Sequence, residues 1–140
     1  MKKKSEILLQ ILLLALCLLG EIGLMTFLAP CGVHEDGAYS TCHWAGQAMK
    51  LILMIMNALA VLALALPEQG MKRGLTVGIA LGAVALFFTP GTTIRLCMMG
   101  TMRCNMITLP GVRVLAAAIL LASLPAVLLP EKKAGKDARA

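Results

Sequence analysis

Four long apolar stretches constrain this sequence more than any other feature. They cover residues 6–28, 47–66, 72–89 and 108–129. About 20 apolar residues form a helix that crosses a hydrocarbon core roughly 30 Å thick, so each stretch is read as a membrane span. Hydrophobic residues make up 59% of the chain and charged residues only 14%, which is outside the range of soluble domains. We therefore predict an all-α integral membrane protein, a single four-helix bundle over residues 1–140.

The connections between these spans are short. They are loops at 29–46 and 90–107, a turn at 67–71 and a tail at 130–140. The first stretch follows three lysines, as in a signal peptide, but its apolar run exceeds the roughly 7–15 residues of an h-region, and no small-x-small site closes it. Leu16 also stands where lipoprotein processing before Cys17 prefers a small residue. We expect an uncleaved first helix and see no room for a soluble catalytic domain.

Basic residues gather on one side of the predicted bundle. Nine lie there: Lys2, Lys3, Lys4, Lys72, Arg73, Lys132, Lys133, Lys136 and Arg139. Four lie on the other side: Lys50, Arg95, Arg103 and Arg113. The positive-inside rule then places both termini and the turn at 67–71 in the cytoplasm of a bacterium, with the bundle in its inner membrane. The net charge of +6 is thus a topology signal that favours contact with lipid and not with nucleic acid.

The two exoplasmic loops hold nearly all reactive side chains. They are the cysteines Cys31, Cys42, Cys97 and Cys104 and the candidate metal or ligand side chains His34, His43, Met98 and Met102. Disulfides persist in oxidising compartments, and four cysteines form two bridges with three possible connectivities. We therefore predict that these loops form a disulfide-stapled, cysteine-rich cap.

The connectivity depends on the second loop. If residues 97–104 are helical, Cys97 and Cys104 lie about 10 Å apart, beyond the roughly 7 Å that a bridge allows between α-carbons. Bridges between the two loops are then favoured, and we prefer this version. If Gly100 breaks the loop into a turn, the local bridges Cys31 to Cys42 and Cys97 to Cys104 are better.

Two other chemistries compete for the cap. Thiolates and thioethers suit Cu(I), and imidazole accepts zinc, copper or haem iron, although the spacing matches no zinc-finger or haem-attachment pattern. Four helices with a cysteine pair in each exoplasmic loop also resemble the outline of the DsbB-type quinone-coupled oxidases. The Cys-x-x-Cys motif typical of such enzymes is absent from the sequence.

Charged residues inside a bilayer are costly and are candidates for function. Glu21 and Arg113 each lie about two turns below the exoplasmic end of their spans. They could form an ion pair that locks the first helix to the fourth. Alternatively, Glu21 is a proton- or ligand-binding carboxylate facing a cavity under the cap. Cys17, one turn below Glu21, is expected to be an inert packing residue.

Small residues indicate how the helices pack. Gly74, Gly78 and Gly82 recur every four residues and form one stripe, which serves either packing inside the bundle or docking of a second membrane protein. The fourth span has a small-residue stripe of its own: Ala116, Ala117, Ala118, Ala122 and Ser123. Trp44 is placed where an indole anchors at the membrane interface.

The motifs of the two loops resemble one family. They are Cys31-Gly32, Asp36-Gly37, Cys42-His43-Trp44, Cys97-Met98 and Met102-Arg103-Cys104, followed by Thr108-Leu109-Pro110. This pattern is similar to small bacterial four-helix membrane proteins grouped as domain of unknown function 4418, and the similarity extends from Ile7 to about Leu129. The resemblance carries no established activity. It implies an accessory role beside ABC transporters that have an extracytoplasmic domain.

The sequence favours a protein that is not an enzyme. It contains no nucleotide-binding loop, no Ser-His-Asp set and no paired catalytic carboxylates, which sets aside hydrolysis and phosphoryl transfer. We predict an accessory subunit whose cap docks a larger membrane protein, such as an ABC transporter, or its ligand; self-association is the other possible partnership. We expect no cofactor, with copper, zinc or haem binding and thiol–disulfide exchange as the alternative functions.

Overall fold

The computed structural model describes residues 2–29, 37, 40–96, 100–101 and 103–128. Four long helices account for most of them: α1 (Lys2–Met25), α2 (Thr41–Ala65), α3 (Gln69–Phe88) and α4 (Leu109–Leu128), the last preceded by a short π-helical segment, η1 (Cys104–Thr108). Each helix, with η1 counted as part of the fourth, is long and apolar enough to cross a membrane. The prediction of an all-α, multi-pass membrane protein is confirmed.

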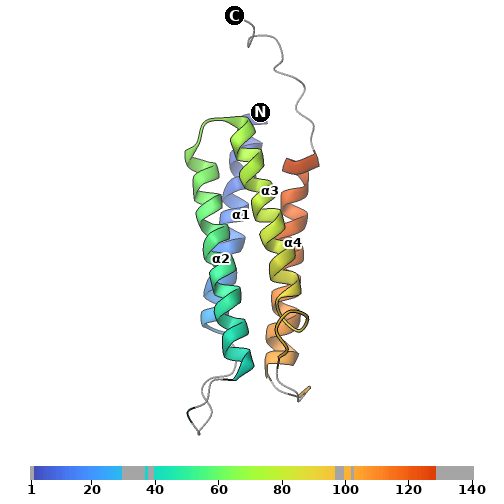
Figure 1. The fold of residues 1–140 in the computed structure, drawn as a ribbon. Helices are drawn as coiled ribbons and strands as arrows, with labels where there is room; N and C mark the ends of the chain where they lie inside the picture. The colour runs from blue at the N-terminus through green and yellow to red at the C-terminus, as the bar shows by residue number, and fades with distance from the viewer. Residues whose placement is uncertain (1, 30–36, 38–39, 97–99, 102, 129–140) are drawn as a thin grey trace, which may run out of the picture.

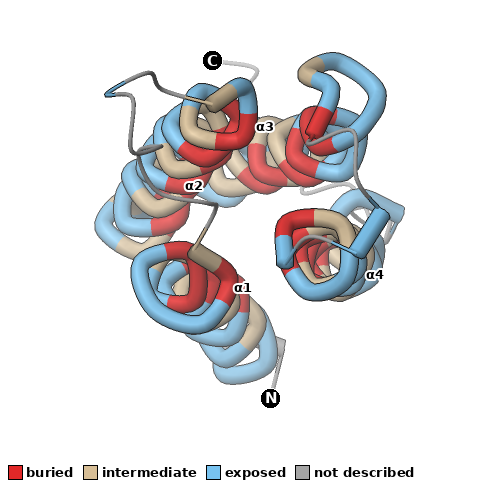
Figure 2. The backbone as a smooth tube through the Cα atoms, turned by 90° about the horizontal axis from the view of Figure 1, so that it is seen from below, coloured by how far each residue is buried: buried red, intermediate tan, exposed pale blue. Residues whose placement is uncertain are grey.

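The helices run up and down in chain order around a bundle. Each helix packs against its neighbour in sequence, and α4 closes the ring against α1 (Figures 1 and 2). The start of α1, the α2–α3 connection and the end of α4 lie together at one end, which we name the turn end. We name the opposite end, where α1 ends, α2 begins, α3 ends and η1 begins, the cap end.

The second helix begins earlier than the apolar pattern suggests. Its first residue is Thr41, so Cys42, His43 and Trp44 lie in its first turn and not in a loop. Ser40 has an extended backbone, and its carbonyl accepts a hydrogen bond from the His43 amide at 2.9 Å, which starts the helix. Hydropathy marks only the apolar part of a helix, whereas the backbone continues helically into the polar interface.

In the interior of the bundle, small residues of one helix pack against large residues of another segment. Gly20 of α1 lies directly against Leu115 of α4, and a β-carbon at Gly111 would meet Leu28 at 2.5 Å. The buried faces of all four helices show in Figure 2 as a band turned toward the bundle axis. The helices therefore approach closely enough to fill the interior with side chains.

The glycine stripe of α3 is divided between two environments. A β-carbon at Gly82 would lie 2.8 Å from Met56, and one at Gly78 would lie 3.3 Å from Leu59, both residues of α2. A β-carbon at Gly74, near the turn end, would meet no atom of another element within 4 Å among the described residues. Two of the three glycines thus serve the α2–α3 contact.

Candidate functional site

The cap end brings some of the predicted cap residues into the core. Cys42 and Cys104 are completely buried and belong to the same apolar cluster. His43 lies edge-to-face with Trp44, with ring centres 5.9 Å apart, and Trp44 itself is 61% exposed. The role of Trp44 as an interface anchor stays a prediction.

The remaining cap candidates lie outside the described residues. They are Cys31, His34, Cys97, Met98 and Met102. The disulfide pairing, the metal site and the thiol-exchange hypothesis therefore stay predictions. Among the residues that are described, no group of three His, Cys, Asp or Glu side chains is placed to hold a metal ion.

One polar contact fastens the first helix to the fourth at the cap end. The hydroxyl of Thr108, at the end of η1, donates a hydrogen bond of 3.1 Å to the carbonyl of Leu28, and both residues are buried. This carbonyl follows the last turn of α1, where a helix leaves carbonyls without intrahelical partners. Thr108 thus donates a hydrogen bond to a carbonyl that follows the last turn of α1. The bond fixes how α1 and α4 are aligned along their axes.

Glu21 and Arg113 do not meet. Glu21 accepts a hydrogen bond of 2.8 Å from the side-chain amide of Asn57 in α2, whereas the Arg113 guanidinium lies 5.5 Å from the ring centre of Phe87 in α3. The ion pair that would lock α1 to α4 is absent from the part of the chain that is described. The reason is rotational: Glu21 projects from the face of α1 that packs on α2, and Arg113 projects from the face of α4 that packs on α3.

Arg113 lines an open groove between α3 and α4 in the cap half of the bundle. The groove has a volume of about 500 Å³ and is lined by Phe87, Asn105, Leu109, Pro110, Arg113, Val114 and Ala117. A second pocket of about 220 Å³ shares Phe87 and Ala117 and continues over Ala83, Val84, Phe88, Ala116 and Leu120. The Nε atom of Arg113 is shielded from solvent and has no hydrogen-bond partner among the described residues. We call these two connected spaces the α3/α4 groove.

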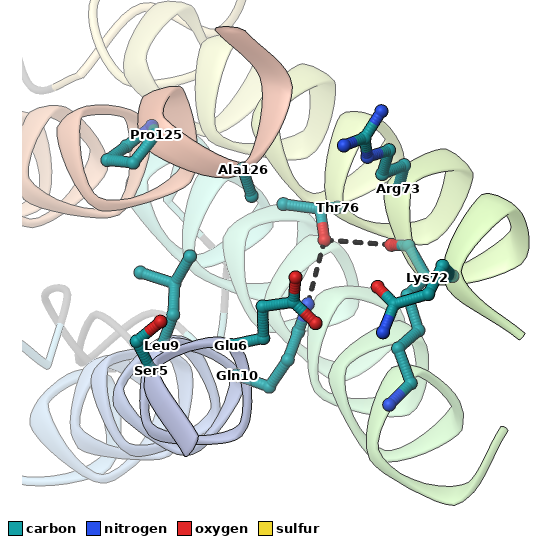
Figure 3. Close-up of a pocket in the computed structure, with 10 residues that line it drawn as sticks. Ser5, Glu6, Leu9, Gln10, Lys72, Arg73, Thr76, Pro125 and Ala126 are labelled. Carbon is teal, nitrogen blue, oxygen red and sulfur yellow. Dashed lines mark hydrogen bonds between the residues drawn. The ribbon is translucent and has the colours of Figure 1, made fainter. Parts of the chain in front are cut away.

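A pocket of about 230 Å³ with a mostly apolar lining lies at the turn end between α1, α3 and α4 (Figure 3). Its lining comprises Ser5, Glu6, Leu9, Gln10, Gln69, Lys72, Arg73, Thr76, Pro125 and Ala126. Figure 3 shows Glu6 and Gln10 leaving α1 toward α3, where Lys72 and Thr76 lie. The pocket therefore combines both signs of charge with an apolar wall.

Gln10 and Thr76 join α1 to α3 across this pocket. The Thr76 hydroxyl donates to the carbonyl of Lys72 at 2.8 Å, so its oxygen is left to accept a hydrogen bond from Nε2 of Gln10 at 3.0 Å. This chain of bonds fixes which way the Gln10 amide faces. Its Oε1 atom is buried, and no described residue donates a hydrogen bond to it.

Comparison with known families gives one match. Residues 9–129 match the family described as Domain of unknown function (DUF4418). The chain belongs to this family. No curated protein and no solved structure matches it. The DUF4418 assignment agrees with the resemblance that the cap motifs indicate, and the four apolar helices lie almost wholly within the matched residues.

Sequence reasoning missed three uncharged polar residues of this DUF4418 member. Gln10, Asn57 and Thr76 all lie inside apolar spans and all make helix–helix hydrogen bonds. A signal was present, because an amide or hydroxyl within a membrane span needs a hydrogen-bond partner. The close-packed Gly20 and Gly111 carry no such signal, since neither belongs to a repeated stripe.

Proposed function

We propose that this protein is a non-enzymatic accessory subunit of a larger membrane complex, such as an ABC transporter, in the bacterial inner membrane with both termini cytoplasmic. In this proposal a helix of the partner docks in the α3/α4 groove and brings a carboxylate to Arg113. The observation that carries the proposal is Nε of Arg113, shielded in an outward-open groove without a hydrogen-bond partner in the described chain. The cap contributes a second, exoplasmic contact.

The position of Arg113 favours an external anion. The residue lies nine positions into the span Cys104–Leu128, about 13 Å below its start at about 1.5 Å per residue. Charged side chains at such depth usually pair with an opposite charge. The ring of Phe87 offsets part of the cost of burying the guanidinium, but it accepts no N–H hydrogen bond in the plane of the group.

The shape of the groove favours a helix as the occupant. Next to Arg113 its floor is made by Ala83, Ala116 and Ala117, which leave room for another backbone to approach. The docking surface therefore differs from the glycine stripe, because Gly78 and Gly82 already face α2. A carboxylate on the docking helix would reach the guanidinium from the adjoining space, which also contains Ala117.

Site-specific photocrosslinking tests this docking. With a benzophenone amino acid at Ala117, we expect a discrete protein adduct in intact membranes that is lost in Arg113→Gln. Arg103→Gln is the matched control, because Arg103 is an exposed arginine at the same end that lies outside the groove. An adduct that forms equally in Arg113→Gln, or an adduct with phospholipid alone, would contradict the proposal.

A further inference from the structure

The turn-end pocket has features of a ligand site that accessory docking does not use. It lies among the first turns of α1 and α3 and the last turn of α4, so in a membrane crossed by these helices it would be near the level of the lipid headgroups. Leu9, Pro125 and Ala126 supply an apolar wall, Glu6 supplies a negative charge, and Lys72 and Arg73 supply positive charges. Such a combination suits an amphiphile whose polar end carries both signs of charge.

The buried Oε1 atom of Gln10 defines what the ligand must offer. Gln10 is only 6% exposed, and its Nε2 is already committed to Thr76. Buried side-chain acceptors normally receive a hydrogen bond, yet no described residue donates to this oxygen. A ligand that fills the pocket should therefore carry an N–H or O–H donor at its polar end.

The charged side chains around the pocket favour an ammonium group as the hydrogen-bond donor of the ligand. The Glu6 carboxylate lies one helical turn from Gln10 on α1 and favours a positively charged donor. Lys72 and Arg73, which line the pocket on α3, favour an anion close to that ammonium. A primary ammonium joined by a short linker to a phosphate meets both conditions.

We propose that the turn-end pocket binds the headgroup of phosphatidylethanolamine from the leaflet at that end of the bundle. The ammonium donates to Oε1 of Gln10 and pairs with Glu6, the phosphate pairs with Lys72, and the glycerol lies against Leu9 and Pro125. Phosphatidylcholine lacks an N–H donor, and phosphatidylglycerol lacks the cation. The affinity of the pocket for these three lipids should therefore depend on the chemistry of the headgroup and not on the apolar tails.

Native mass spectrometry of the full-length protein in detergent tests the ranking. Titration with short-chain forms of the three lipids should show phosphatidylethanolamine bound at least about tenfold more tightly than phosphatidylcholine, as expected for one charge-assisted hydrogen bond. Equal retention of these two lipids would overturn the proposal. Tighter binding of phosphatidylglycerol would also overturn it, since this would show a site for an anion alone.

Variants at the pocket locate the effect. Glu6→Gln, at an exposed position that leaves the core untouched, and Gln10→Met, which removes the buried acceptor, should each abolish the preference for the primary ammonium. Glu68→Gln is the matched control, an exposed glutamate at the turn end outside the pocket lining. If Glu6→Gln and Glu68→Gln behave alike and Gln10→Met keeps the wild-type preference, the pocket is not the lipid site.

The phosphate contact has its own pair of variants. Lys72→Gln should weaken phosphatidylethanolamine binding about tenfold, whereas Lys4→Gln, an exposed position on α1 outside the pocket lining, should leave it unchanged. An unchanged affinity in Lys72→Gln would contradict the assigned phosphate position. These results are independent of the α3/α4 groove, so they do not depend on the docking proposal.

Discussion

Glu21 and Arg113 both carry a charge within an apolar span, and the bundle treats them differently. Glu21 is held by Asn57 from the neighbouring helix, whereas the guanidinium of Arg113 rests on an aromatic ring beside an open groove. The carboxylate has its hydrogen bond inside the chain, and the shielded Nε of Arg113 has none among the described residues. In the docking proposal this difference separates a residue that holds the fold together from one that pairs with a partner.

The largest effect is expected where the bundle is tightest. Gly20→Leu would force a side chain into Leu115 and toward Leu53. Extra methylenes in a packed core cost typically about 1–3 kcal/mol of unfolding free energy, and because a whole leucine side chain is added here we expect a loss of about 3 kcal/mol or more. The measurement is unfolding in detergent followed by circular dichroism. Gly74→Leu, at a glycine where an added β-carbon would meet no described atom of another element within 4 Å, is the control and should leave unfolding unchanged. Equal destabilisation by both substitutions would show that the α1–α4 contact is looser than described.

The hydrogen bond from Asn57 to Glu21 is tested by replacing Asn57, which supplies the donor. Asn57→Leu should lower the unfolding free energy by about 1.5–3 kcal/mol, because the carboxylate loses its hydrogen bond inside the apolar layer. In a protein that already carries Glu21→Leu, Asn57→Leu should lower the unfolding free energy much less. A double-mutant cycle in detergent measures the coupling between Asn57 and Glu21. If the effects of the two substitutions on the unfolding free energy were additive, the Asn57–Glu21 hydrogen bond would not stabilise the fold.

A smaller effect on stability is expected at Arg113. Arg113→Gln removes a cation–π contact worth about 0.5–1 kcal/mol, so unfolding of the isolated protein should change less than in Asn57→Leu. The measurement is the same unfolding transition, with Arg103→Gln as the reference. A loss of stability as large as that of Asn57→Leu would mean that Arg113 serves the fold, and the contrast between the two charges would fail.

The smallest effect is expected at the turn end. Thr76→Val deletes the hydrogen bond from Gln10, and such bonds between membrane helices contribute about 0.6 kcal/mol on average. Thr92→Val, at an exposed threonine beyond α3, is the control for loss of a hydroxyl. If Thr76→Val destabilised the bundle by more than Asn57→Leu, the turn-end pocket would be the main link between helices.

The architecture follows directly from the sequence, because four apolar runs of membrane-spanning length leave few alternatives. The sequence does not predict how each helix is rotated about its own axis. Glu21 and Arg113 lie at similar depths, which suggested a pair, but depth says nothing of the direction in which each side chain projects. Gly78 is a similar case, since its stripe predicts close packing without naming α2 as the partner.

The cap shows a different limit of sequence reasoning. Its cysteines and histidines are recognised from residue type and loop position, yet Cys42 and Cys104 are buried within or beside helices and are not displayed in loops. Helical geometry at the membrane interface, which hydropathy does not report, moves these residues into the core. The pairing of the four cap cysteines stays a prediction, which mapping of disulfide-linked peptides with and without reductant would decide.

The docking proposal is tested most directly by reversing the charge at Arg113. Once the adduct formed at Ala117 identifies a partner, its membrane-embedded carboxylate can be replaced with lysine. We predict that Arg113→Glu abolishes the adduct and that combining it with the partner's lysine variant restores it. Failure of the double reversal to restore the adduct, when both variants are present in the membrane at wild-type levels, would contradict a charge pair in the α3/α4 groove.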